Sequence, residues 1–260
     1  MNGKVLLEIA GSRVRITLFH PGKFNAMSRQ MWRDLRTAFE GIQQRRDINC
    51  VLIRGESGQF CAGGDISEYS DFRFEEASLR EFHEQEVWGA LQAMLDCDVP
   101  IVAQIEGNCM GAGLEIASCC DIRIAAHTAR FGVPTGKLGF PVAPREAALL
   151  IHAVGDVTAR EMVLSATVLD AGAMQQRGFL SQVVPEAQIR AAALERIRCI
   201  SLLGPQAARQ NKASFRALAP VISMHAAIKL ASTAYGYAPS AEHREGIAAF
   251  IEKRPAQFVI

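Results

Sequence analysis

The chain lacks several features that would place it in other classes of protein. It has no run of about 18 apolar residues, so the sequence predicts no transmembrane helix. Its formal net charge is only +1, and we therefore expect no nucleic-acid partner and no attachment to an anionic membrane. The apolar N-terminal stretch is short and interrupted by Glu8, which favours a first strand over a signal peptide.

Signals for metal sites and disulfides are also missing. The seven cysteines are odd in number, form no C-x-x-C pair and mostly lie in apolar runs. The six histidines are scattered without ligand spacing, so no metal site is expected. Buried free thiols are typical of a reducing compartment, and we expect a cytoplasmic protein.

What the sequence does contain is an alternation of short apolar strands and helical patterns. At 260 residues with 49% hydrophobic residues, it fits a globular protein of the α/β class. Strands are expected at residues 5–9, 14–18, 50–54, 101–105, 122–125 and 181–184. Helices are expected after Ser28 and at residues 71–96, 145–154 and 158–165, and helices alone from residue 186 onward. This order indicates an α/β core of repeated ββα or βαβ units with a helical tail.

Two glycine turns follow two of the predicted strands. The first is CAGGD at residues 61–65, and the second is the GAG at residues 111–113. If the strands at 50–54 and 101–105 are neighbours, both turns lie at one edge of the sheet. One backbone N–H from each turn would then hold a single carbonyl oxygen, and each such donor stabilises a developing oxyanion by roughly 2.7–4 kcal/mol. The alternative is a pair of tight turns that bind nothing.

One carboxylate, Glu115, lies in the first turn of the helix that follows the second glycine turn. The helix dipole lowers the pKa of such a group, whereas burial raises it. A desolvated glutamate that exchanges protons near neutral pH is a common general acid or base. The alternative is a carboxylate that only accepts bonds from local N–H groups.

Glycine loops of this kind also occur in nucleotide-binding proteins. A dinucleotide site of the short-chain dehydrogenase type needs a Y-x-x-x-K pair and a loop near the N-terminus. Here the loop begins at Gly107, and none of the three tyrosines has a lysine four residues later. The segment from Gly132 to Lys137 is one residue too short for a phosphate loop. Both alternatives are therefore disfavoured.

Six blocks along the chain together resemble the enoyl-CoA hydratase/isomerase (crotonase) family. The blocks are KFNAMS at 23–28, FCAGGDI at 60–66, GNCMGAGLE at 107–115, DIRIA at 121–125, FGVP at 131–134 and EGIAAFIEKR at 245–254. The resemblance implies a crotonase-like α/β spiral of ββα repeats over residues 1–195. It further implies a C-terminal helical trimerisation region over 196–260, and a homotrimer or dimer of trimers.

The resemblance also implies a coenzyme A thioester as substrate and no further cofactor. By motif position, the amides of Gly64 and Ala112 would bind the thioester oxygen. The backbone at Ala62 would meet the adenine ring, and Lys23 would lie near the phosphates. Lys253 or Phe250 of a neighbouring subunit would close the pocket, although a solvated or packing role is equally expected for these two and for Lys23. From the same motifs, the further residues expected at the substrate are Asp65, Ile66, Gly111 and Thr135.

The chain departs from the family pattern at Thr135. Hydratases of the family use two glutamates, of which one matches Glu115 and the other follows the proline of F-G-x-P. Threonine stands in the second place and is far too weak an acid to exchange protons at pH 7. Possible substitutes are Glu146 on the predicted 145–154 helix and His83, Glu84 and Glu86 on the 71–96 helix. A first-turn helix carboxylate after Pro144 is the favoured interpretation for Glu146, and a charged solvated face is favoured for the other three.

These observations favour an enoyl-CoA hydratase-type lyase that acts through a thioester enolate. Two alternatives stay open. One is decarboxylation of a malonyl-type thioester, because related decarboxylases keep the carboxylate at the Glu115 position and lack the second one. The other is an acyl-CoA-binding protein with little turnover.

Overall fold

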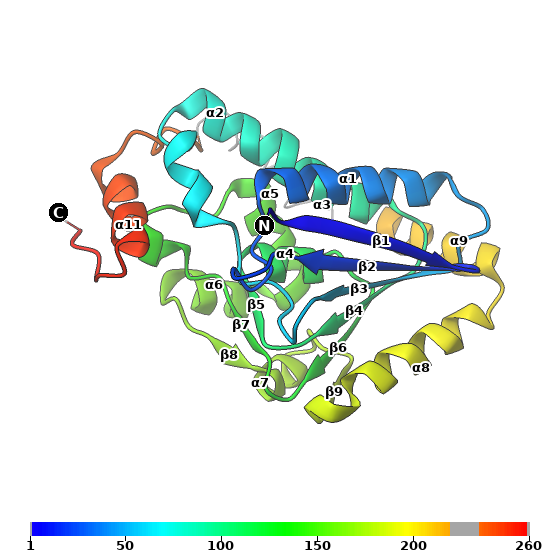
Figure 1. Ribbon diagram of the computed structural model, residues 1–260. Coiled ribbons are helices and arrows are strands. Elements are labelled where there is room, and N and C mark those ends of the chain that lie inside the picture. The colour runs from blue at the N-terminus through cyan, green and yellow to red at the C-terminus, as the bar shows by residue number, and fades with distance from the viewer. Residues whose placement is uncertain (1, 219–233, 259–260) are drawn as a thin grey trace.

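The computed structural model describes residues 2–218 and 234–258. Its main sheet has the strand order β1-β2-β3-β4-β6-β9 (Figure 1). The strands are β1 (Lys4–Ala10), β2 (Arg13–Phe19), β3 (Cys50–Gly55), β4 (Ile101–Ile105), β6 (Ile122–Ala126) and β9 (Gln182–Val184). β1 and β2 form the expected antiparallel hairpin, and every other neighbouring pair is parallel. β3 and β4 are adjacent, as the argument from the two glycine turns required.

Helices cover both faces of this sheet, which explains why its central strands are mostly apolar. In β3, Val51 and Ile53 belong to the larger core cluster, shared with helix α1 (Arg29–Gln44). Cys50 and Leu52 alternate with them and belong to a second cluster with helix α8 (Ile189–Ser201). Because successive side chains of a strand point to opposite faces, a strand covered on both sides is apolar at most of its positions.

The helices begin and end largely where the sequence predicts. The hydroxyl of Ser28 accepts a bond from the Met31 N–H and caps α1, as expected. The predicted 71–96 helix starts only at residue 76 and is made of α2 (Glu76–Glu81), a π-helical segment (Phe82–Val87) and α3 (Trp88–Asp96). The remaining helices are α4 (Ala112–Ser118), α5 (Pro144–Val154), α6 (Asp156–Leu164), α7 (Ala171–Gln176), α9 (Pro205–Leu218) and α11 (Ala241–Ile251).

A second, small sheet was not foreseen from the sequence. It consists of β5 (Asn108–Met110), β7 (Arg130–Gly132) and β8 (Leu169–Asp170). Strands of two or three residues are too short to show an alternating pattern, so periodicity gave no signal for them. β5 leads directly into α4, and this small sheet therefore fixes where the second glycine turn lies.

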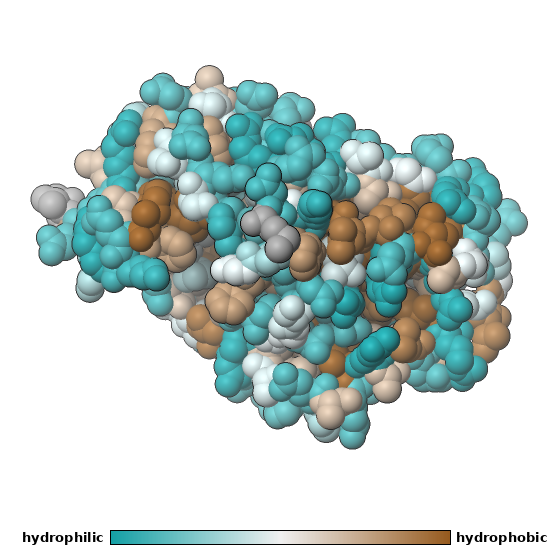
Figure 2. Space-filling view, viewed as in Figure 1, coloured by the Kyte–Doolittle hydropathy of each residue, from teal (hydrophilic) through white to brown (hydrophobic). Residues whose placement is uncertain are grey.

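Exposed apolar side chains mark parts of the surface. Figure 2 shows hydrophobic residues gathered over the edge strand β1, where Leu6, Leu7 and Ile9 are each about 40% exposed. Further along the chain, Leu202, Leu203, Phe215 and Leu218 are exposed at the ends of α8 and α9. The predicted boundary at residue 195 lies inside α8, and residues 219–233 of the helical tail expected from residue 186 onward lie outside the described residues.

Candidate active site

The two glycine turns lie against one another. A β-bridge pairs Cys61 with Cys109, and the Met110 N–H donates to the Cys61 carbonyl at 2.9 Å. A Cβ added at Gly113 would lie 2.6 Å from that same carbonyl, so only glycine permits this approach. Gly111 takes a φ of +44°, which also favours glycine. The predicted meeting of the turns at one sheet edge is therefore confirmed.

The loop at residues 23–28 holds the first turn in place. The Met27 N–H donates to the Gly63 carbonyl, and the Asp65 N–H donates to the Met27 carbonyl, each at 2.8 Å. Asn25 fixes this loop because its side-chain amide donates to the carbonyls of Glu56 and Gln59. The KFNAMS motif at residues 23–28 thus holds the CAGGD turn at residues 61–65 in position.

Two backbone amides at these turns have no partner. Within residues 2–218 and 234–258, neither the Gly64 N–H nor the Ala112 N–H donates a hydrogen bond. Ala112 is the first residue of α4, where helix geometry leaves the N–H groups free. Gly64 also has to be glycine, because a Cβ there would lie 2.0 Å from the Tyr69 hydroxyl. Both residues line the same cavity, so two donors are available to one ligand.

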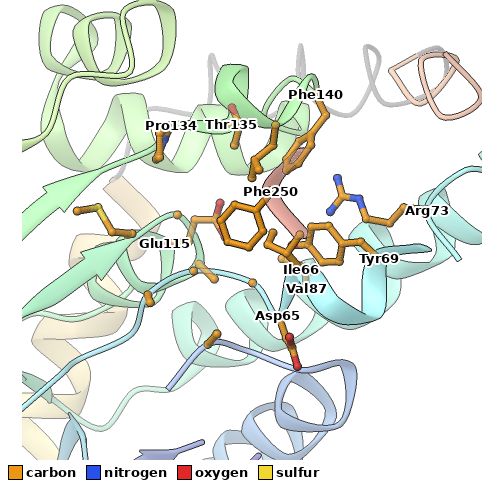
Figure 3. A pocket seen from close by; sticks show the side chains of 18 of the residues that line it. Asp65, Ile66, Tyr69, Arg73, Val87, Glu115, Pro134, Thr135, Phe140 and Phe250 are labelled. Carbon is orange, nitrogen blue, oxygen red and sulfur yellow. The ribbon is translucent and has the colours of Figure 1, made fainter. Parts of the chain in front are cut away.

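That cavity has a volume of about 490 Å³ and contains nearly all of the predicted site residues (Figure 3). Those that line it are Lys23, Ala62, Gly64, Asp65, Ile66, Gly111, Ala112, Glu115, Thr135 and Phe250. Lys253 is the exception and does not line it. Segments far apart in the sequence therefore meet at one site, and Figure 3 shows Glu115, Thr135 and Phe250 around the same space.

Glu115 projects from the first turn of α4 and is only 6% exposed. Burial is the main cause that raises the pKa of its carboxyl well above the usual value, and the negative charge of Glu146 adds to it. The positive charge of Arg73 acts in the opposite direction. Glu115 is thus a desolvated carboxyl group with a raised pKa, as a proton-transferring residue near neutral pH requires.

A second carboxyl group, Glu146 of α5, lines the cavity together with His83. The two side chains are hydrogen-bonded, with 2.7 Å between His83 Nδ1 and Glu146 Oε1. Burial raises the pKa of Glu146 to about 8 and lowers that of His83 well below its usual value. The solvated position expected for His83 is therefore wrong, because the π-helical segment turns its side chain inward. Glu146 lies in the first turn of α5, as expected, and its side chain is buried.

The other two substitutes named from the sequence lie outside the cavity. Glu84 accepts a hydrogen bond from Tyr235 at 2.6 Å and pairs with Arg145 at 3.1 Å. Glu86 is buried and is held by Arg29 and Arg33, so a solvated position is wrong for it as well. The ion pair of Glu84 links the π-helical segment to α5, and the ion pairs of Glu86 link it to α1.

Thr135 lines the wall of the cavity. It stands at the position where the family resemblance implies a second glutamate. Its hydroxyl is buried and has no hydrogen-bond partner among the residues that the structure describes. It follows Pro134 in a 3₁₀ turn, Thr135–Leu138. An unpaired buried hydroxyl costs free energy unless a ligand or water satisfies it.

Phe250 of α11 lines the cavity of its own chain, whereas the sequence analysis placed it in a neighbouring subunit. The reason is a close contact at Gly246, where an added Cβ would lie 2.2 Å from the Leu138 carbonyl carbon. Gly139 makes the matching approach to Glu242 of α11. Gly139 and Gly246 thus let α11 pack closely enough for Phe250 to reach the cavity.

The mouth of the cavity carries an ion pair. Lys23 Nζ lies 2.6 Å from Asp65 Oδ2 and 2.7 Å from the Ser67 hydroxyl. The lysine side chain is 41% exposed, while the carboxylate is buried. Desolvation opposes ionisation of Asp65, but its bonds to Lys23 and Ser67 prevail and lower its pKa.

One charged residue of the cavity was missed from the sequence. Arg73 lies in the stretch that was expected to be helical, and its side chain is almost fully buried. Phe72 and Phe74 flank it in the sequence, but nothing in that pattern distinguishes it from a surface arginine.

The comparison with known proteins decides the family. The sequence model of the family Enoyl-CoA hydratase/isomerase matches residues 8–259. The chain belongs to this family. A "probable enoyl-CoA hydratase" of Mycobacterium bovis is 33% identical over 244 residues, which are 94% of this chain and 93% of that protein. The 2,3-dehydroadipyl-CoA hydratase of Escherichia coli is 30% identical over the same shares of the two chains.

Solved structures of crotonase proteins share the fold. An enoyl-CoA hydratase/carnitine racemase of Magnetospirillum magneticum superimposes with a TM-score of 0.80 at 31% identity, over 98% of this chain and 95% of the other. The predicted crotonase fold with a helical C-terminal region is thereby confirmed. Within the described ranges no three His, Cys, Asp or Glu residues are grouped to hold a metal ion. None of the helices described is long and apolar enough to span a membrane.

Proposed function

We propose that this crotonase-family protein is an enoyl-CoA hydratase-type lyase that works through a thioester enolate. The observation that carries the proposal is the pair of unpartnered amides, Gly64 and Ala112, which line one cavity with the buried Glu115. The hydratase relatives of Mycobacterium bovis and Escherichia coli support the same class of reaction.

The two amides would bind the thioester carbonyl oxygen. They are main-chain donors held in place by the surrounding turns, so they need little reorganisation when charge develops on the oxygen. The positive end of α4 also favours negative charge at this place, because Ala112 begins that helix. Each donor of such a pair stabilises the transition state by roughly 3 kcal/mol.

Glu115 and Glu146 would share the proton transfers. The oxygen of water bonds to the β-carbon of the enoyl group while the Glu115 carboxylate takes a proton from that water. The π-electron pair moves to give the enolate, and the α-carbon then takes a proton from the Glu146 carboxyl. Return of the proton from Glu115 to Glu146 restores the pair, and the net change is the addition of one water molecule.

Glu146 is suited to this part because its carboxyl pKa of about 8 leaves it protonated near neutral pH. Two buried carboxyl groups whose charges repel one another do not both ionise readily, which keeps one acid and one base available. In this proposal Glu146 takes over the role of the acid that Thr135 cannot fill.

The remaining predicted residues would hold the coenzyme A part. Ala62 would contact the adenine ring, and Lys23, paired with Asp65 at the mouth, would lie near the phosphates. We further propose a homotrimer or dimer of trimers. The exposed apolar side chains of α8 and α9 support this assembly, since such side chains are commonly covered in an interface.

A second candidate function is the decarboxylation of a malonyl-type thioester. Thr135 favours it, because decarboxylation needs the enolate-stabilising amides more than a strong acid at the α-carbon. The buried Arg73 favours it too, since a cation in the acyl part of the cavity suits a carboxylate. An acyl-CoA-binding protein with little turnover is the third possibility.

A panel of enoyl-CoA and malonyl-CoA thioesters separates these functions. Loss of enone absorbance reports hydration, release of CO₂ reports decarboxylation, and micromolar binding without turnover indicates a binding protein. The Glu115→Gln variant is expected to lower kcat for hydration by about 10² or more. An unchanged kcat in that variant would remove Glu115 from the mechanism.

A further inference from the structure

Arg73 lies in the turn that precedes α2 and is 1% exposed. The rings of Tyr69 and Phe140 both lie against its guanidinium group, each with its centroid 4.2 Å from the guanidinium carbon, and the two rings also contact one another edge to face (Figure 3). Among the described residues it makes one hydrogen bond, a long one of 3.4 Å from Nη2 to the Tyr237 hydroxyl. Its Nε is buried and has no partner among the described residues.

The half-buried Arg123 and the buried Arg209 are satisfied in a different way. Arg123 donates to the backbone carbonyls of Ala117, Cys120 and Phe179. Arg209 donates to the carbonyls of Arg45 and Ile48. Arg73 has no such carbonyl and, within the described residues, no carboxylate within 4 Å. A buried cation with unused donors is costly, so an anion that enters the cavity would gain from meeting it.

Among the described residues neither acid of the cavity forms an ion pair with Arg73, and in the proposed reaction only one of the two is ionised at a time. Burial raises the pKa values of both Glu115 and Glu146, and both therefore hold protons more tightly than exposed glutamates do. The positive charge of Arg73 opposes these shifts but does not cancel them. The cavity thus holds a buried positive charge against aromatic rings, with no direct ion pair among the described residues, and charge pairing there is stronger than in water.

The place of Arg73 relative to the two amides indicates which part of a ligand it would meet. Tyr69 packs against Gly64 through its hydroxyl and against Arg73 through its ring face. The Tyr69 side chain therefore separates the Gly64 amide from the Arg73 guanidinium group. The ligand group that meets Arg73 would lie a short acyl chain away from the thioester carbonyl.

We infer that Arg73 binds a carboxylate at the far end of the acyl group, so that the substrate is the coenzyme A thioester of a short dicarboxylic acid. This inference rests on the proposed function for the thioester part. The planar guanidinium group matches a carboxylate, and the two rings hold it in one orientation. Arg73 would select the substrate and fix the end of the chain away from the amides.

The test compares two enoyl thioesters, glutaconyl-CoA with a terminal carboxylate and crotonyl-CoA with a methyl group. For the wild-type protein we expect kcat/KM to favour glutaconyl-CoA. In Arg73→Met the ratio of the two kcat/KM values should fall at least about tenfold, as expected when a charged hydrogen bond is lost. An equal fall for both thioesters, or a wild-type preference for crotonyl-CoA, would overturn the inference.

The matched control is Arg244→Met. Arg244 also stacks on an aromatic ring, Phe74 at 4.4 Å, but it does not line the cavity, so the ratio should stay as in the wild type. Arg73→Lys keeps the charge and serves if the Met variant does not fold. It should retain part of the preference, because lysine cannot make the two parallel bonds of a guanidinium group.

Binding of unreactive analogues separates this inference from the proposed reaction. Thioether analogues of the two ligands, in which the carbonyl is absent, are titrated by calorimetry. Tighter binding of the carboxylate analogue that disappears in Arg73→Met supports the inference even if hydration is not observed. Equal binding of both analogues would contradict it even if hydration is observed.

Discussion

His83 of the π-helical segment and Glu146 of α5 form a buried pair, with 2.7 Å between Nδ1 and Oε1. The two residues are 63 positions apart in the sequence. The raised pKa of Glu146 and the lowered pKa of His83 favour a neutral pair. A carboxyl proton would then bridge to Nδ1 and leave the second ring nitrogen, Nε2, with the other proton. Nε2 is buried without a partner among the described residues. The pair therefore keeps a proton inside the cavity.

The first prediction concerns Glu146 as the acid that replaces the missing one. Glu146→Gln should lower kcat for hydration by about 10²-fold, because general acid catalysis of this kind contributes roughly 10²–10⁴-fold. Steady-state kinetics with an enoyl thioester measure the change. The control is Glu76→Gln, which removes a half-exposed carboxylate paired with Arg80 and should leave kcat unaltered. If both variants behave alike, Glu146 is a structural residue.

The second prediction is a dependence of stability on pH. The folded protein keeps a proton on Glu146 up to about pH 8, whereas the unfolded chain loses it near 4.5, so this contribution to stability falls as pH rises through that window. Glu115 acts in the same direction. The unfolded chain gains a proton on His83 below 6.5 that the folded protein lacks, so the His83 contribution falls as pH falls.

The opposing slopes of His83 and Glu146 offset one another below pH 6.5, and the carboxyl slope stands alone between 6.5 and 8. In that interval the free energy of unfolding should fall with pH by up to about 1.4 kcal/mol per unit for each proton involved. Urea unfolding at fixed protein concentration measures it. Glu146→Gln should flatten the slope, and an identical slope in variant and wild type would show that Glu146 ionises normally.

The third prediction concerns the contact between the two glycine turns. Gly113→Ala should destabilise the protein by about 1–3 kcal/mol, because the new methyl group would lie 2.6 Å from the Cys61 carbonyl and neither backbone can move freely. Gly41→Ala is the matched control. Gly41 lies inside α1 with nothing within 4 Å of an added Cβ, so alanine should stabilise by about 0.5–1 kcal/mol. Equal effects at both positions would mean that the turns do not meet closely.

The sequence was sufficient for the features that depend on local pattern. The main strands, the cap at Ser28 and the two glycine turns follow from spacing and residue type, and the structure places them as expected. The adjacency of β3 and β4 then brought the turns together. Glu115 could be placed because its helix begins at the second turn.

The features that could not be predicted depend on which face of a helix is covered. His83 and Glu146 lie on stretches rich in charge, and nothing local distinguishes an inward carboxylate from a solvated one. The π-helical segment shifts the register of its side chains by one residue per turn relative to an α-helix, which single-sequence periodicity does not reveal. The sequence predicts a helix at Arg73, whereas the structure has a turn there, so the direction of the Arg73 side chain could not be predicted.

Gly64 and Ala112 present main-chain N–H groups to the cavity, so these donors are largely independent of how the side chains around them evolve. Substitution of a neighbouring side chain, such as threonine for an acid at position 135, can alter the reaction without touching either N–H. Only a proline, or a residue too large for the space beside Tyr69, would disturb the donors themselves. In the proposed function, thioester binding would therefore be retained with the fold, while single mutations would change the reaction of the bound thioester.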